Sequence, residues 1–181
     1  MTQDNSKDKD RVEIKESYYA SGTLSTRSPY VNGKRHGIVK FYDESGALWV
    51  ETPYENGERQ GIRKEYYKSG ALRCETSYEN GKMHGIKRFY YESGSIKYEV
   101  PYENGIRHGI DKYYYESGAL DRETPHDDGK MHGIEKYYGK DTSNIDCIIL
   151  YNKDREVLTL CCESYRGPVS PIIQGGHCES E

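Results

Sequence analysis

Four histidines recur at matching positions along the chain and are the first candidates for metal chemistry. They are His36, His84, His108 and His132, and Gln60 interrupts the series. If each copy of this pattern forms two strands of one sheet, equivalent residues lie two strands apart, about 9.5 Å. The ligands of one zinc ion each lie about 2 Å from it, so these histidines cannot share a metal. We therefore expect turn residues here, and no metal or cofactor.

Catalytic motifs are absent from the printed sequence. It contains no Gly-x-Ser-x-Gly, no phosphate-binding glycine loop and no His-Glu-x-x-His. Acidic residues recur as regular columns, whereas a catalytic pair needs a single site with a perturbed environment. His177 and Cys178 form at best a weak thiol–imidazole pair. The sequence predicts no enzyme and no catalytic residue.

The cysteines and the hydropathy of the chain bear on its location. Five cysteines at irregular spacing argue against a disulfide framework. No run approaches the roughly 20 apolar residues of a transmembrane helix. The first nine residues are polar and charged, unlike a secretory signal. The sequence therefore predicts a cytoplasmic protein with no membrane partner.

One column of basic side chains invites a comparison with nucleic-acid-binding proteins. This basic stripe comprises Lys40, Lys64, Arg88, Lys112 and Lys136. Tyrosines lie beside it, so a groove that combines base stacking with phosphate contacts is conceivable. Between residues 22 and 141, however, 19 Lys and Arg are balanced by 19 Asp and Glu. Nucleic-acid binding needs positive charge, so we favour lysine stems that lie along tyrosine rings and reach nearby carboxylates.

A repeat of 24 residues must position all of these side chains. One of its glycine series is Gly22, Gly46, Gly70, Gly94 and Gly118. Only 34% of residues are hydrophobic, yet the chain has 19 Tyr, so a large apolar core is excluded. The pattern predicts an all-β fold, an elongated and twisted single-layer antiparallel sheet of tandem β-hairpin repeats.

Each repeat reads as two strands joined by a Glu-Ser-Gly turn and closed by an Asn-Gly turn. Aromatic and β-branched residues favour strands, and Asn-Gly favours a hairpin turn. A three-residue turn would pair Tyr42 with Leu48 and Ile38 with Thr52. This register would place Ile38, Tyr42 and the Tyr54 column on one face, with Val39 and Glu51 on the other.

The Asn-Gly turn does not fit this alternation without an extra residue. A plain two-residue turn at Asn56-Gly57 would place Ile62 on the wrong face, because a slip of one residue inverts a strand. We therefore expect a bulge beside this turn, with Gly61 supplying the unusual backbone conformation.

The ends of the chain differ from the repeats. We predict a flexible N-terminus at 1–11, a repeat array at 12–141, a capping hairpin at 142–165 and a tail at 166–181. The hairpin is apolar on both faces, because Ile145–Tyr151 and its partner strand alternate little. Terminal repeats act as caps, but an apolar end strand is also a docking surface, so a homodimer through this hairpin is the alternative.

The residues of the repeat resemble a known family. The string Tyr-Glu-Asn-Gly-Lys-x-His-Gly-Ile, followed by Tyr-Tyr-Glu-Ser-Gly-x-Leu, is similar to the MORN repeat variant found in bacterial proteins. Some of these proteins are labelled YwqK-type antitoxins. The resemblance covers residues 12–141 and implies a curved, elongated β-sheet. The antitoxin label implies binding to a partner protein.

Residues that break the repeat are the candidates for partner recognition. Variable side chains on a regular scaffold suit recognition in repeat arrays, and Trp, Tyr and Arg dominate binding hot spots. The candidate partner-binding residues are Trp49, Arg73, Tyr98, Arg122, Leu158 and Leu160.

Three functions stay open on the sequence alone. The first is a non-catalytic scaffold that neutralises or inhibits a partner by occupancy, either a toxin or, in a mobile-element setting, a defence nuclease (anti-CRISPR-like). The net charge of −4 suits a basic partner. The second is a self-assembling structural protein. The third is a lipid- or nucleic-acid-binding module that uses the basic stripe and its tyrosines.

Overall fold

The computed structural model describes residues 11–140 and 144–161, which contain strands and turns but no helix. The all-β prediction is confirmed. Within these two ranges, no segment forms a helix that could cross a membrane. The tail at 166–181, with His177 and Cys178, lies outside the described residues, as does nearly all of 1–11. The proposed domain boundaries stay predictions.

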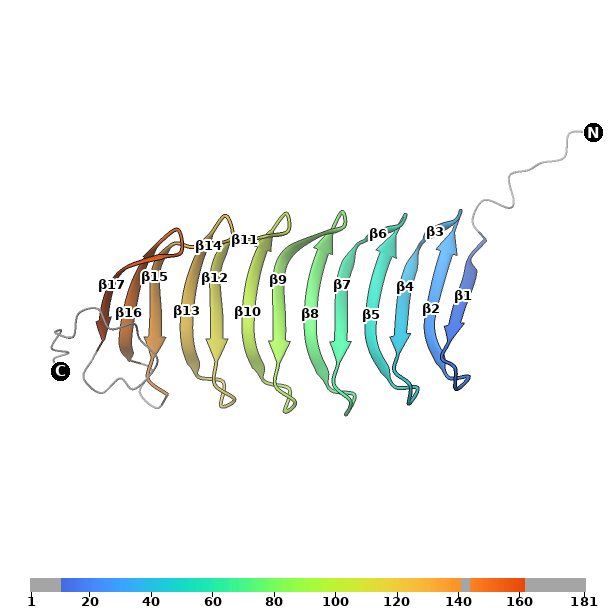
Figure 1. Ribbon diagram of the computed structural model, residues 1–181, viewed down its shortest axis with the longest axis horizontal. Coiled ribbons are helices and arrows are strands. Elements are labelled where there is room, and N and C mark those ends of the chain that lie inside the picture. Colours follow the sequence, from blue (N-terminus) through green and yellow to red (C-terminus); the bar gives the residue numbers. More distant parts are fainter. Residues whose placement is uncertain (1–10, 141–143, 162–181) are drawn as a thin grey trace, which may run out of the picture. The chain divides into compact units, whose positions relative to one another are not determined.

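The chain forms two compact units, divided between His84 and Gly85. In the first unit, each strand pairs antiparallel with the next one or two along the chain. The strands, blue to green in Figure 1, are β1 (Glu13–Tyr18), β2 (Leu24–Val31), β3 (Lys34–Arg35), β4 (Gly37–Tyr42), β5 (Leu48–Glu55), β6 (Glu58–Arg59), β7 (Gly61–Tyr66) and β8 (Leu72–Glu79).

The second unit repeats this arrangement. Strand β9 (Lys82–Tyr90) enters it at Gly85, and pairing again runs between consecutive strands. The other strands, green to red in Figure 1, are β10 (Ile96–Glu103), β11 (Ile106–Arg107), β12 (Gly109–Tyr114), β13 (Leu120–Asp127), β14 (Lys130–Met131), β15 (Gly133–Tyr138), β16 (Ile145–Asn152) and β17 (Arg155–Cys161). In each unit the strands form a single layer.

The Asn-Gly turns and the bulge beside them follow the prediction. Asn56 and Gly57 have φ values of 51° and 94°, the left-handed geometry that a tight hairpin turn requires. Tyr54 pairs with Arg59, whereas Glu51 pairs with Lys64, so the strand after the turn carries two more residues than β5 between these pairs. The bulge therefore lies at Gln60 and Gly61, and Gly61 has the positive φ of 97° that was expected there. The backbone N–H of Gln60 donates to the carbonyl of Pro53 at 3.1 Å.

A second bulge, which the sequence analysis did not anticipate, corrects the assignment of faces. Tyr42 pairs with Leu48 as predicted, but the register then shifts, so Phe41 pairs with Val50. Ile38 consequently lies opposite Pro53, and the predicted pairing of Ile38 with Thr52 was wrong. The placement of Ile38 and Tyr54 on one face was also wrong, because one extra residue inverts every side chain beyond it.

The two faces of the sheet differ in burial. We call one the groove face; it carries the columns of Val39, Phe41, Val50, Thr52 and Tyr54. All buried side chains in the described part of the chain belong to this face, among them Val39, Val50 and Thr52. We call the other the ladder face; its columns begin with Ile38, Lys40, Tyr42, Glu51 and Pro53. Ile38 and its counterparts are 37–51% exposed there.

One disulfide joins the last two strands. Cys147 on β16 lies directly opposite Cys161 on β17, and their sulfur atoms are bonded. Cys74 is buried. The sequence argued only against a disulfide framework and did not anticipate this one pair, because facing positions in a hairpin are set by its register and do not show in the spacing along the chain.

Candidate functional site

A groove of about 390 Å³ opens on the groove face of the first unit. Four aromatic side chains line it: Phe41 from β4, Trp49 and Tyr54 from β5, and Tyr78 from β8. Phe41 and Trp49 meet edge to face, with ring centroids 6.5 Å apart and planes inclined by 67°. Trp49 is the bulged residue of β5 and stays 46% exposed. The bulge thus presents the only tryptophan of the chain to the groove.

The rest of the groove is formed by two small side chains and two cations. Val50 and Thr52, both buried, lie beneath the aromatic residues. Arg59 from β6 and Arg63 from β7 complete the lining, which contains no acidic residue. A volume of this size falls within the range of about 300–1,000 Å³ that is usual for ligand sites.

The guanidinium groups of this face rest on tyrosine rings. Arg59 lies 5.1 Å above the ring of Tyr78 and donates to its hydroxyl at 3.1 Å. One repeat earlier, Arg35 lies 5.3 Å above the ring of Tyr54. Hydrogen bonds to Tyr54 and Tyr78 raise the pKa of Arg59 above its ordinary value. These contacts hold both cations against the rings, and a guanidinium has further N–H donors that can meet an anionic partner.

A carboxylate beside the groove holds Arg63 and one further arginine. Glu65 forms ion pairs with Arg63 and with Arg73, which is one of the predicted partner-binding residues. Burial raises the pKa of Glu65, but the hydrogen bonds and charges of the two arginines outweigh burial and lower it. Glu65 therefore stays ionised and orders both side chains, of which Arg73 is 45% exposed.

The groove face of the second unit carries a buried polar cluster instead. Asp111 on β12 is fully buried, although Val39 occupies the same position three repeats earlier. Its Oδ2 lies 3.6 Å from Nδ1 of His126 and 3.5 Å from Arg107, and neither carboxylate oxygen accepts a hydrogen bond. Burial raises the pKa of Asp111, and the nearby charges of His126, Arg107 and Arg122 offset this only in part.

Two predicted residues lie beside this cluster and stack on aromatic rings. Tyr98 stacks between Phe89 and Tyr113, with centroid distances of 4.1 and 5.7 Å. Arg122 lies 4.0 Å above the ring of Tyr113, and its Nε lies 3.8 Å from Glu135. Both are therefore packed into the sheet surface and held by neighbours.

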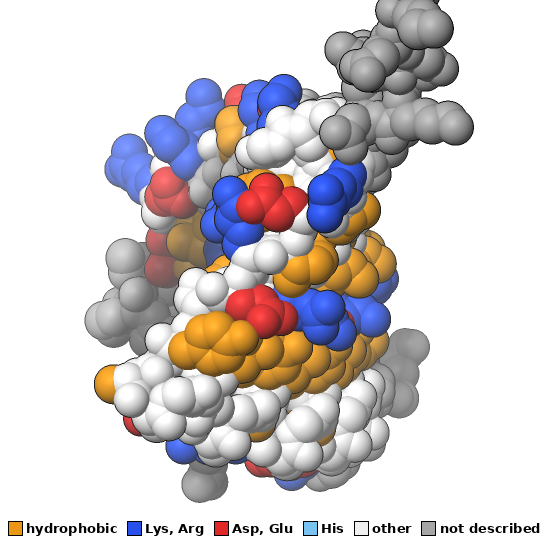
Figure 2. All heavy atoms as spheres, turned by 90° about the vertical axis from the view of Figure 1, so that its right-hand side faces the viewer, with side chains coloured by type: hydrophobic (Ala, Val, Ile, Leu, Met, Phe, Trp, Pro, Cys, Tyr) orange, Lys and Arg blue, Asp and Glu red, His pale blue; other side chains and the backbone are white. Residues whose placement is uncertain are grey.

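The ladder face binds its cations internally. Lys40 pairs with Glu51 at 3.1 Å, Arg88 with Glu99 at 2.8 Å and Lys136 with Glu123 at 3.9 Å. A tyrosine of the following repeat donates to each of these carboxylates; Tyr66, for example, donates to Glu51 at 2.9 Å. Figure 2, which views the molecule from the β1 end, shows acidic and basic side chains next to one another beside bands of hydrophobic side chains. Three of the five residues of the basic stripe thus meet carboxylates, in agreement with the sequence prediction for these three.

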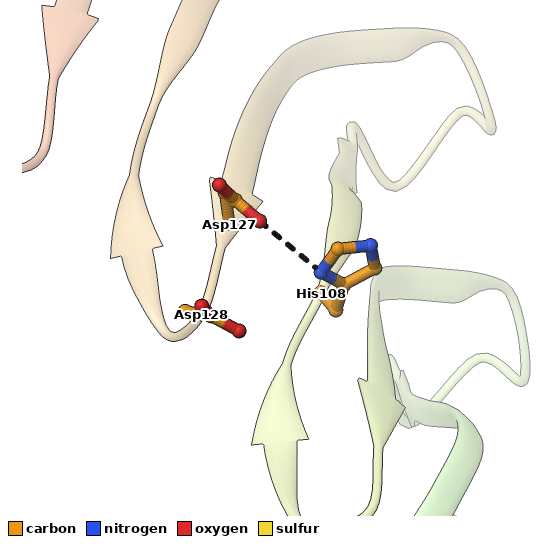
Figure 3. Close-up of side chains that lie close together, drawn as sticks. All are labelled: His108, Asp127 and Asp128. Atoms are coloured by element: carbon orange, nitrogen blue, oxygen red, sulfur yellow. Dashed lines mark ion pairs between the residues drawn. The ribbon is translucent and has the colours of Figure 1, made fainter.

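A histidine and two aspartates converge at one turn of the second unit. His108 precedes β12, and Asp127 and Asp128 end β13 and begin the next turn; their ligand atoms lie within 4.8 Å of one another (Figure 3). Nδ1 of His108 lies 3.5 Å from Asp127. All three side chains are exposed, and other histidines of the series serve the turns: the N–H of Asn56 donates to His36 at 3.5 Å. The sequence argument considered only histidines sharing a metal and missed this mixed cluster.

The last two predicted residues lie on β17 in the end hairpin. Leu158 is half-buried and pairs with Leu150, whereas Leu160 is 37% exposed. Val157, which precedes Leu158, is 54% exposed. Among the described residues, β17 pairs only with β16, so it is an edge strand with apolar side chains in solvent.

The structure brings some of the predicted residues together and separates others. Trp49 and Arg73 lie at or beside the groove of the first unit, and Tyr98 and Arg122 lie together in the second. Sequence reasoning missed Phe41, Arg59 and Arg63. A signal for Arg63 was present, since its column changes in every repeat: Val39, Arg63, Lys87, Asp111 and Glu135.

Comparison with known proteins identifies the repeat. Residues 35–56, 59–80 and 83–104 match the family model of the MORN repeat variant. These are three consecutive copies of the 24-residue pattern, so the chain carries MORN repeats, as its resemblance predicted. Repeats of this kind commonly serve as binding or scaffold modules. No curated protein matches the chain.

Proposed function

We propose that the protein is a non-catalytic scaffold that binds a partner protein on its groove face and neutralises it by occupancy. The observation that carries the proposal is the groove of the first unit, where the only tryptophan stands exposed on a regular sheet beside stacked arginines. Partially exposed Trp, Tyr and Arg in a concave site are the residue types that dominate protein-binding hot spots.

The partner proposed here is a toxin or an effector enzyme, such as a defence nuclease. Inhibition by occupancy needs only a surface that covers the active site of the partner, and it needs no chemistry from the scaffold itself. The repeating ladder face supports this division of roles, because three of its five stripe cations are already paired with carboxylates and bring little new electrostatic energy to a partner.

The test compares two variants in a tagged pull-down from native cells, read by mass spectrometry. Trp49→Ala removes the aromatic anchor, and a combined charge reversal of the basic stripe removes the ladder cations. If a partner protein binds the groove face, Trp49→Ala should reduce the amount of partner recovered at least about tenfold more than the charge reversal does. A larger loss in the stripe variant, together with a steep salt dependence, would indicate a phosphate-bearing ligand instead.

Self-assembly through the end hairpin is a second candidate, favoured by one observation. Val157 and Leu160 are exposed on the edge strand β17, and unpaired strand edges with apolar side chains template pairing with another chain. Sedimentation at rising concentration should then reveal a homodimer, which Leu160→Lys abolishes. A monomer at all concentrations would contradict this candidate.

We also propose that the protein lies in the cytoplasm. The redox state of Cys147 and Cys161 tests this location. Disulfides persist in oxidising compartments and are rare where glutathione keeps thiols reduced. In the cytoplasm, Cys147 and Cys161 should therefore be recovered as thiols after rapid acid trapping and alkylation in intact cells. Complete recovery of the disulfide would contradict a cytoplasmic location.

A further inference from the structure

We propose that the groove of the first unit binds an acidic peptide segment of the partner, with a large apolar side chain inserted against Trp49. This inference rests on the proposed function and specifies the chemistry of its partner. The apolar part of the site is the corner formed by Phe41, Trp49 and Val50. Because the two rings meet edge to face, they form a concave wall that a side chain of the partner can fill.

The charge of the groove selects an acidic partner. Its lining includes Arg59 and Arg63 and no acidic residue. Arg35 and Arg73 lie beside it, so Glu65 is the one carboxylate among these groups, and it is held between two of them. A carboxylate of the partner would complete a charge-assisted hydrogen bond with a guanidinium that is already held against a ring.

The charge of the groove lining, more than the net charge of the whole chain, decides which partner the groove attracts. The net charge of −4 suggested a basic partner. At physiological ionic strength, however, interactions between exposed charges are largely screened beyond about 8 Å. The arginines that line the groove are within that range of a bound segment, whereas most acidic residues of the chain are not part of its lining.

A peptide fits this groove better than a single-stranded nucleic acid. Sequence-tolerant nucleic-acid sites stack successive bases on free aromatic faces along a track of cations. Here guanidinium groups already lie over the rings of Tyr54 and Tyr78. Phe41 and Trp49 are not parallel, and the basic stripe lies on the ladder face, where carboxylates hold its cations.

The experiment is a selection of random dodecapeptides displayed on phage against the full chain, followed by affinity measurements on selected peptides. We expect enriched peptides to carry net negative charge together with an aromatic or large aliphatic residue. Their affinity should fall at least about tenfold with Trp49→Ala and several-fold with Arg59→Gln. Arg59→Lys should recover only part of the loss, since lysine keeps the charge without the planar fork.

The matched control is Arg107→Gln, which changes the equivalent arginine of the second unit and should leave peptide affinity unchanged. Enrichment of basic or uncharged peptides, or acidic peptides insensitive to Trp49→Ala and Arg59→Gln, would overturn the inference. A single-stranded oligothymidine that competes at equal affinity would also overturn it. The pull-down distinguishes a failure of this inference from a failure of the proposed function. A native partner that binds independently of Trp49 and Arg59 refutes the inference alone. Peptide binding without any native partner refutes only the proposed function.

Discussion

Asp111 is the residue at which the groove face departs furthest from an apolar strand surface. Its carboxylate is fully buried without a hydrogen bond, whereas Val39 fills the corresponding position of an earlier repeat. Burial raises the pKa of Asp111 in the folded state, despite His126 and Arg107 nearby. A carboxyl group with a raised folded pKa favours folding at low pH, where it is protonated. It loses that contribution as the pH rises through the folded pKa.

Replacing Asp111 should therefore stabilise the protein at neutral pH. We expect Asp111→Val to raise the free energy of unfolding by about 1–3 kcal/mol at pH 7, because it removes a buried carboxylate whose oxygens accept no hydrogen bond. The gain should shrink towards about pH 4, near the ordinary pKa of an aspartate, where the wild-type carboxyl is increasingly protonated. Urea unfolding of both proteins at the two pH values measures this. A loss of stability at pH 7 would show that His126 and Arg107 more than compensate the buried charge.

Tyrosines of the ladder face should give the protein a characteristic alkaline transition. Burial, followed by the hydrogen bond to Glu99, raises the pKa of Tyr114 to about 12; Tyr66 and Tyr138 have the same value through Glu51 and Glu123. Because the folded pKa exceeds the ordinary value of 10, these groups stabilise the fold up to about pH 10. That contribution disappears as the pH rises towards 12.

Tyrosinate absorbance during an alkaline titration measures these groups directly. We expect a fraction of the tyrosines to ionise only near pH 12, with unfolding in the same range. Glu99→Gln removes the acceptor charge and should return Tyr114 towards its ordinary pKa of 10. A titration in which all tyrosines ionise together near pH 10 would contradict the hydrogen-bonded ladder.

At the scale of strands and turns, the sequence predicted what depends on local chemistry. The Asn-Gly turn and the bulge at Gly61 could both be predicted, because these positions need a positive φ that few residues other than glycine and asparagine adopt. The bulge at Trp49 could not, since tryptophan carries no such local signal and the shift arises from pairing between β4 and β5. That one residue decided which side chains face the groove, so the faces were misassigned although the turns before Ala47 and at Asn56-Gly57 were predicted correctly.

Gly109 tests the bulge beside the Asn-Gly turn. Its φ is +109°, and an added Cβ would lie 3.1 Å from Cγ of Pro101. Gly118 is the matched control, because it also has a positive φ, +89°, but nothing within 4 Å of its Cβ position. We expect Gly118→Ala to cost about 1–2 kcal/mol of stability through backbone strain. Gly109→Ala should cost about 1–3 kcal/mol more through the clash. Equal losses in thermal unfolding would mean that the proline shifts freely.

At the scale of the whole molecule, the 24-residue repeat predicts some residues of the groove and not others. Trp49 and Arg73 were predicted because they break a regular column, and they lie at the groove. Arg59 belongs to a column in which arginine recurs, so it was treated as part of the scaffold. Its role depends on the strands that surround it: Tyr78 comes from β8 and Trp49 from β5. Such a combination of neighbours is a tertiary property, which a single repeat does not contain.

The two compact units should respond separately to a local change. Strands in each unit pair only with their near neighbours along the chain, so stability is a sum of local contributions and nearest-neighbour interfaces. We expect Gly109→Ala to speed amide hydrogen exchange in β12 and β13 by roughly tenfold or more, in proportion to its cost in stability. Exchange in β4 and β5 of the first unit should change far less. The measurement is native-state exchange read by mass spectrometry of peptides from each strand, with Gly118→Ala as the control. An equal rise in all strands would show that the chain unfolds as one cooperative body, and the division between His84 and Gly85 would then carry no energetic meaning.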